Sequence, residues 1–461
     1  MSLQFITGNS GNGKTKYLFN RIVKEAKANP RDNYLVIVPE QFTMQTQRQL
    51  VDLSENKAIM NIDVLSFKRL AYRVFDELGI TNLTVLEETG KNLVLRKLAA
   101  QEADKLGVIG RNLNRIGYIS EVKSLLSELV QYNISPEELG RYIASGRLSD
   151  TLSDKLKDVL VLYEAFEKFM QDKYITAEEI LNVLSNVAEE SAILRNSVIA
   201  FDEFTGFTPI QNQLIKKLFV ISKKIYVTLT IDCREDIFKS RGMQELFDMP
   251  KRTVKSLTEM AAFYGIEVEE PIILDKNYRL AENEELSFME QQLFRKRRCS
   301  FKKAPKHIHI DCLRDPKQEL TKIARRINEL VRNENLRYRD IAIVTGDVNI
   351  YAGYVREIFD KYNIPYFIDA TQEILFHPFI EFIRSIPDIA AQNFSADAVF
   401  RFLRCGFSEL LDSEIDVLEN YVLACGVRGK SAWDKKWVRL PKHKAGYDLE
   451  LLNQSREYIM E

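Results

Sequence analysis

The expected fold of this chain starts from one segment, Gly8-Asn9-Ser10-Gly11-Asn12-Gly13-Lys14-Thr15. It fits the pattern G-x-x-x-x-G-K-[ST] and lies between an apolar run, residues 3–7, and a run with helical spacing that begins at Lys14. Glycines let the backbone curl so that successive N–H groups and the helix start face one point. A second apolar run, residues 34–38, follows and ends at Pro39. Together these segments predict a βαβ unit with a parallel sheet.

Length and composition limit the class of protein. The 461 residues exceed the roughly 250–300 at which a single core stops growing, so we expect two or more domains. Hydrophobic residues make up 45% and charged residues 28%, which is typical of a soluble globular protein. Sixty-five basic and sixty-six acidic residues give a net charge of −1. A nucleic-acid partner would therefore have to be held in a local groove, because the overall charge provides no attraction.

Cysteine usage and apolar runs indicate where the protein works. The five cysteines are widely spaced and include no CxxC pair, so they predict neither a disulfide framework nor a zinc ribbon. This pattern fits a reducing cytoplasm. No apolar run reaches about 18 residues, and we expect neither a leader peptide nor a membrane partner.

The sheet continues along the chain with a long helical interruption. A third strand is expected at residues 62–65, followed by an amphipathic helix at 67–78. Helical spacing then dominates, and strand character returns at residues 198–201 and 225–229. We therefore expect a first α/β domain made of residues 1–85 and 190–290, with a helical insertion at 86–189.

A second α/β unit is expected after a basic segment. Residues 291–306 combine a basic run with a proline and no apolar period, which predicts a linker. Residues 307–375 should then form strands at 308–312, 341–345 and 366–368, with helices at 318–331 and 351–362. Residues 376–461 are helical in pattern and carry no stop signal, so we expect the chain to be cut inside a domain.

The glycine-rich segment predicts a site for ATP and Mg²⁺. Lys14 would bring its charge to the β- and γ-phosphate oxygens, and Thr15 would ligate Mg²⁺. The alternative is a chance glycine turn. The expected nucleotide-binding residues are Gly8, Asn9, Ser10, Gly11, Asn12, Gly13, Lys14 and Thr15.

Two carboxylates follow the apolar strand at 198–201. Asp202 would hold Mg²⁺ through water, and Glu203 would polarise the attacking water. The alternative is a solvated strand end, because an Asp-Glu pair after an apolar run is common.

Asn277-Tyr278-Arg279 resembles the Asn-Tyr-Arg of superfamily 1 helicases, where the arginine reaches the γ-phosphate across the cleft between two domains. Arg279 would sense the nucleotide and couple hydrolysis to domain closure. The alternative is a surface arginine in an acidic neighbourhood.

Aromatic and polar residues follow the strands at their carboxyl ends, where open α/β sheets bind ligands. The aromatic rings could stack on bases, and the polar groups could bond base edges or phosphates. The alternative is that Phe67 and Tyr72 cover the core and that Gln41 caps a helix. The candidate DNA-binding residues are Gln41, Thr43, Phe67, Arg69, Tyr72 and Phe207.

Several motifs together resemble the AddB (RexB-like) family. They are Gly-x-Ser-Gly-x-Gly-Lys-Thr near the start, Val-Pro-Glu-Gln at 38–41, Ser-Phe-x-Arg-Leu-Ala at 66–71 and Phe-Thr-Gly-Phe-Thr-Pro at 204–209. Residues 364–369, 377–379 and 418–429 extend the match over essentially the whole chain. The resemblance implies two RecA-like domains of superfamily 1 helicase type, each interrupted by a helical insertion, with the second truncated.

The resemblance also implies a function. The chain would be one subunit of an ATP-dependent helicase-nuclease that partners an AddA-type subunit, degrades double-strand DNA ends and pauses at Chi for recombinational repair. Its helicase core would be a degenerate motor that binds ATP and recognises Chi as single-stranded DNA through the six candidate residues. The family's nuclease and its four-cysteine [4Fe-4S] cluster are expected only in a longer protein, since the clustered cysteines do not occur here.

Two other functions are compatible with the same residues. In the first, the chain is a module in which bound ATP locks a DNA-reading conformation without hydrolysis. In the second, it is a P-loop kinase, although the helical insertion and the Asn277–Arg279 segment argue against this.

Overall fold

A computed structural model describes residues 1–81, 84–108, 110, 117–146, 148–171, 174–295, 299–370, 374–441 and 446–460. The chain divides into two compact units, Met1–His309 and Ile310–Glu461. Three basic residues of the expected linker, at positions 296–298, lie outside the described residues.

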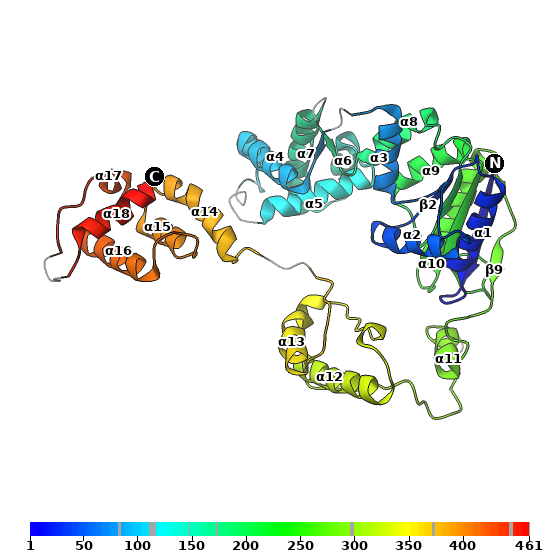
Figure 1. The fold of residues 1–461 in the computed structure, drawn as a ribbon. Coiled ribbons are helices and arrows are strands. Elements are labelled where there is room, and N and C mark those ends of the chain that lie inside the picture. The colour runs from blue at the N-terminus through cyan, green and yellow to red at the C-terminus, as the bar shows by residue number, and fades with distance from the viewer. Residues whose placement is uncertain are drawn as a thin grey trace. The chain divides into compact units, whose positions relative to one another are not determined.

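The first unit is built on a seven-stranded sheet in the order β3-β2-β6-β7-β1-β8, with β9 also paired to β1. Figure 1 labels β2 and β9 of this sheet. Every recorded pairing is parallel, as expected for strands joined through helices. The α/β class and the five strands expected from the sequence in this unit are confirmed. The strands are β1 (Ser2–Gly8), β2 (Tyr34–Ile37), β3 (Ile62–Leu65), β6 (Val198–Phe201), β7 (Lys224–Thr230), β8 (Glu267–Val268) and β9 (Ile272–Leu274).

Helices cover both faces of the sheet, so the central strands are buried on both sides. Alternation along β1 shows this directly, because Phe5 packs in one core and the adjacent Ile6 packs in the other. One face is covered by α1 (Lys14–Ala28) and α2 (Thr43–Leu53). The other is covered by α3 (Phe67–Leu78), α8 (Ile180–Val187), α9 (Pro209–Ile221) and α10 (Asp248–Phe263).

The helical insertion has its own core, formed by α4 (Glu88–Gln101), α5 (Tyr118–Gln131), α6 (Pro136–Ala144) and α7 (Asp150–Met170). Two short strands, β4 (Val85–Leu86) and β5 (Ile175–Thr176), pair in parallel where the chain enters and leaves it. Helix α8 falls within the expected insertion of 86–189, but its Ile180 and Leu184 are buried in the core of the sheet. Helical spacing shows which face of a helix is buried and does not show which core buries it.

The regular elements in the described part of the second unit are helices, joined by irregular segments. Helices α12 (Pro316–Asn333) and α13 (Val348–Lys361), close to the expected 318–331 and 351–362, share one small core. A second core surrounds Trp433 and collects side chains from the helices that follow. These helices are α14 (Pro378–Ala391), α15 (Ala396–Leu403), α16 (Asp412–Cys425), α17 (Lys430–Trp433) and α18 (Leu449–Met460).

The three strands expected in the second unit are wrong. Residues 308–312, 341–345 and 366–368 have no regular secondary structure, and no strand forms in the described part of this unit. Ile310 and Val344 are 95% and 94% exposed, whereas the side chains of a covered parallel strand are buried. A strand requires a neighbour for its N–H and C=O groups, and these segments find none among the described residues. A second RecA-like domain is therefore not confirmed.

Candidate nucleotide site and nucleic-acid interface

The glycine-rich segment turns sharply from β1 into α1. Gly11 and Gly13 have φ angles of 90° and 79°, in the left-handed region that favours glycine. Gly13 is the N-cap of α1, and no side chain among the described residues caps this end. The first N–H groups of α1 are therefore available to an anion, which the helix dipole also favours.

The Asn277–Arg279 segment lies directly on this loop. The backbone N–H groups of Tyr278 and Arg279 approach the carbonyl oxygen of Gly11 at 3.0 and 3.4 Å, and Asn277 Nδ2 donates to the carbonyl of Ser10 at 3.0 Å. A Cβ atom at Gly11 would lie 2.8 Å from Asn277 Oδ1, so only glycine fits there. Arg279 Nη1 donates to Ser10 Oγ at 3.4 Å. The arginine thus belongs to the same unit as the loop and does not reach it across a cleft between domains.

Lys14 is folded back against the loop. Its Nζ donates to the carbonyl oxygens of Gly8 and Asn9, both at 3.0 Å. Burial lowers the pKa of Lys14, although the carboxylates of Asp202 and Glu203 act in the opposite direction. A phosphate beside the loop would give this partly desolvated ammonium a full counter-charge.

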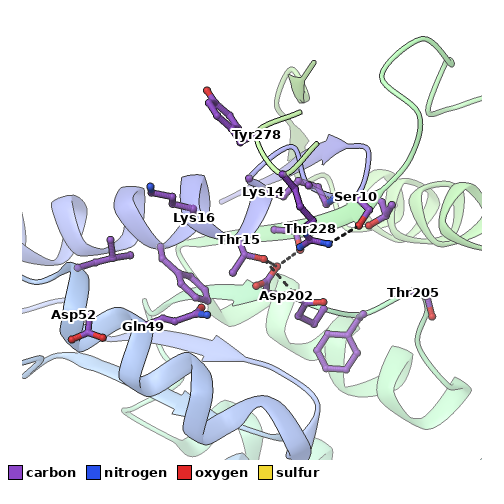
Figure 2. Close-up of a pocket in the computed structure, with 18 residues that line it drawn as sticks. Ser10, Lys14, Thr15, Lys16, Gln49, Asp52, Asp202, Thr205, Thr228 and Tyr278 are labelled. Carbon is purple, nitrogen blue, oxygen red and sulfur yellow. Dashed lines mark hydrogen bonds between the residues drawn. The ribbon is translucent and has the colours of Figure 1, made fainter. Parts of the chain in front are cut away.

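Asp202 lies at the carboxyl end of β6, two strands from β1 in the sheet. Figure 2 shows Thr15, Thr228 and Asp202 converging there. Asp202 Oδ1 accepts from Thr15 Oγ1 at 3.3 Å and from the hydroxyl of Thr228 on β7. Burial raises the pKa of Asp202, and its Oδ2 has no hydrogen-bond partner among the described residues. An unpaired buried carboxylate oxygen beside a threonine hydroxyl matches the oxygen ligands that Mg²⁺ prefers.

Glu203 follows with a strained backbone. Its φ angle is 64°, which is uncommon for a residue other than glycine, and its Oε1 accepts from Thr15 Oγ1 at 3.4 Å. The left-handed turn thus brings a second, exposed carboxylate to the threonine of the loop.

These residues share a pocket of about 760 Å³, a size typical of small-molecule sites. Sequence reasoning missed part of its lining, namely Lys16, Phe19, Gln49, Asp52, Leu53, Thr228 and Thr230. No motif marks them, because the order of strands in the sheet brings them together. The described residues contain no group of three or more His, Cys, Asp or Glu side chains placed to hold a metal ion.

The candidate DNA-binding residues gather at one edge of the sheet. The register places Ile37 of β2 opposite both Leu65 of β3 and Phe201 of β6, so the loops after these strands are neighbours. Gln41 lies in the short 3-10 helix η1 (Glu40–Phe42), and Arg69 and Tyr72 lie on α3. All three side chains are exposed, and Tyr72 retains 39% of its surface. The N-cap of η1 is Pro39 and that of α2 is Phe42, so Gln41 does not take the capping role of the alternative at either helix.

Two of the six candidates are buried in this structure. Phe67 is 7% exposed, and its ring packs 5.8 Å from Phe201, 5.6 Å from Phe204 and 6.3 Å from the half-buried Phe207. Buried Thr43 donates its hydroxyl to the carbonyl of Glu40 at 3.0 Å. The alternative that Phe67 covers the core therefore describes this conformation, and Tyr72 is the aromatic ring that α3 leaves exposed.

The parallel sheet, the glycine-rich loop before its first helix and the buried carboxylate beside that loop define an α/β protein whose sheet edge is suited to an anionic ligand. The family model described as ADDB, N-terminal matches residues 5–290, and the chain belongs to this family.

Curated relatives agree with this assignment. The B subunit of an ATP-dependent helicase/deoxyribonuclease from Lachnoclostridium phytofermentans is 39% identical over 100% of this chain and 40% of its own length. Proteins of the same name from Clostridium acetobutylicum and Clostridioides difficile are 34% and 33% identical over 95% and 100% of this chain and 38% and 40% of their own lengths. The chain thus spans about 40% of the length of these relatives. None of the helices in the described ranges is both long and apolar enough to cross a membrane.

Proposed function

We propose that this chain is the ATP-binding and DNA-contacting part of an AddB-type subunit of an ATP-dependent helicase-deoxyribonuclease. The observation that supports this most strongly is the placement of Thr15 and the unpaired Oδ2 of Asp202 beside the glycine-rich loop. The names of the relatives, which describe ATP-dependent helicase/deoxyribonuclease subunits, agree with that chemistry.

Each side chain of the site has a role in this proposal. Lys14 exchanges the loop carbonyls for the β- and γ-phosphates, while Thr15 and Asp202 would hold Mg²⁺. The ion would supply positive charge beside the phosphates. Glu203 orients water, and Arg279, already on the loop at Ser10, approaches the γ-phosphate from the same unit.

Single-stranded DNA binds at the edge formed by η1, α3 and the loop after β6. Tyr72 stacks on a base, while Gln41 and Arg69 supply polar contacts. In the described conformation, the rings of Phe67 and Phe207 pack against each other beneath the surface of this face. In the whole protein, this face recognises Chi while the complex with an AddA-type subunit degrades the DNA end in the cytoplasm. The nuclease with its [4Fe-4S] cluster belongs to the longer chain.

An alternative is a DNA-reading module that ATP locks without hydrolysis. The absence of a sheet from the described residues of the second unit favours it for this chain, because motor enzymes close a second α/β domain over the γ-phosphate. ATPase measurements with and without single-stranded DNA distinguish the two. Hydrolysis stimulated by DNA supports a motor, and nucleotide-dependent DNA binding without hydrolysis supports the locked module. Absence of both nucleotide and DNA binding contradicts the proposal.

A further inference from the structure

Glu40 joins the two elements that carry the exposed candidate DNA residues. It precedes Gln41 in η1, and its carboxylate accepts hydrogen bonds from α3. The Ser66 hydroxyl donates to Glu40 Oε2, and Arg69 Nε donates to Glu40 Oε1 at 3.2 Å. None of the sequence motifs assigned a role to this carboxylate.

The contacts of Glu40 form a closed ring with the start of α3. Ser66 is the N-cap of α3, and its Oγ accepts from the backbone N–H of Arg69 at 3.3 Å. Arg69 in turn donates its side chain to Glu40. Because Ser66 is buried and bonded to both partners, the ring holds the Glu40 carboxylate against the start of α3, the helix that carries Arg69.

The Glu40–Arg69 pair is itself open to solvent. Both side chains are 56% exposed. An exposed ion pair of this kind contributes little to stability, so a phosphate can replace the carboxylate at small cost. The same carboxylate repels any phosphate that approaches Arg69. A phosphate that binds Arg69 also leaves the Glu40 carboxylate without its positively charged partner.

We propose that Glu40 is a specificity-determining residue of the DNA face. Its carboxylate occupies Arg69 and weakens the binding of single strands that offer phosphates alone. A strand whose bases also form hydrogen bonds with Gln41 and stack on Tyr72 gains enough binding free energy to displace the Glu40 carboxylate from Arg69. Base contacts and phosphate contacts contribute separately to this free energy. This inference rests on the proposed DNA face.

The test measures binding of a labelled oligothymidylate to the 461-residue chain over a range of salt concentrations. Glu40→Gln removes the charge and keeps the shape. We expect it to bind about fivefold more tightly at low salt, the upper range for an exposed pair. The slope of log K against log salt should steepen by about 0.7, the value for one further phosphate contact on a single strand. Glu40→Asp, which keeps the charge, should retain the wild-type slope.

Glu55→Gln is the matched control. Glu55 forms an exposed pair with Lys27 at 2.6 Å, beyond the far end of α2. The 11 residues of α2 span about 16 Å, well beyond the Debye length of about 8 Å at physiological salt. This variant changes the net charge equally and should bind like the wild type.

The outcomes separate the inference from the proposed DNA face. Equal affinity and slope for Glu40→Gln and Glu55→Gln, with Tyr72→Ala weakening binding, overturn the role of Glu40 and leave the DNA face standing. Weaker binding by Glu40→Gln at an unchanged melting temperature would show that Glu40 helps to position Arg69 for DNA, which also overturns the inference. A wild-type chain that binds no oligothymidylate overturns both.

Discussion

The carboxylate of Asp202 is buried beside the glycine-rich loop, where its charge is costly in the absence of a cation. Burial raises its pKa above the ordinary value of 3.8. The folded protein therefore holds the proton more tightly than the unfolded chain. The resulting stabilisation is fully present below pH 3.8 and is lost as the pH rises through the folded-state pKa.

We predict that Asp202→Asn stabilises the nucleotide-free chain at neutral pH. The gain should amount to about 1.4 kcal/mol for each pKa unit of the shift. It should shrink as the pH falls toward 3.8, where the aspartate is protonated in both states. Urea unfolding of both proteins at several pH values measures it. An asparagine variant that is less stable than the wild type at neutral pH would show that the buried charge is already compensated.

At the scale of elements, helix α3 carries two aromatic side chains with different surroundings. Phe67 lies among Phe201, Phe204 and Phe207, whereas Tyr72 is exposed. Phe67→Ala should reduce the free energy of unfolding by about 3–5 kcal/mol, as expected for a truncated core aromatic residue. Tyr72→Ala should leave stability nearly unchanged and weaken single-stranded DNA binding by about 1–3 kcal/mol with the same salt slope. Paired unfolding and binding measurements test this, and a stable Phe67→Ala would contradict the core assignment.

Sequence patterns predicted elements better than they predicted which elements meet. Strand β3 and helix α3 begin and end at the expected residues, because apolar spacing and the Ser66 cap determine them locally. The segments at 308–312 and 341–345 have the same apolar character, yet they form no strand in the described structure. Pairing partners decide strand formation, and apolar spacing contains no information about them.

For the site too, the sequence predicted individual residues better than the contacts between them. The motif identified Lys14 and Thr15, and an apolar strand identified Asp202. Thr228 was missed because it meets Asp202 only through the position of β7 between β1 and β6. Glu40 was missed because its contact with Arg69 depends on the pairing of β2 with β3.

For the whole chain, our expectation about ATP hydrolysis depends on the second unit. Its described residues contain no sheet that could close over a γ-phosphate. We predict turnover well below about one ATP per second, the lower range of working enzymes, with or without DNA. Steady-state phosphate release measures this, and Lys14→Ala supplies the background. Turnover at or above that rate would show that the chain completes a motor site without a second sheet.

The glycine-rich loop should bind Mg·ATP, and thermal unfolding with and without the nucleotide tests this binding. A ligand at about 100 times its Kd stabilises a folded protein by about 2.7 kcal/mol. The wild type should therefore melt at a higher temperature with Mg·ATP. Lys27→Ala, an exposed change in the last turn of α1, should behave in the same way. Lys14→Ala should gain no protection, because it lacks the ammonium that lies against the loop. Equal protection of Lys14→Ala and the wild type would contradict the assignment.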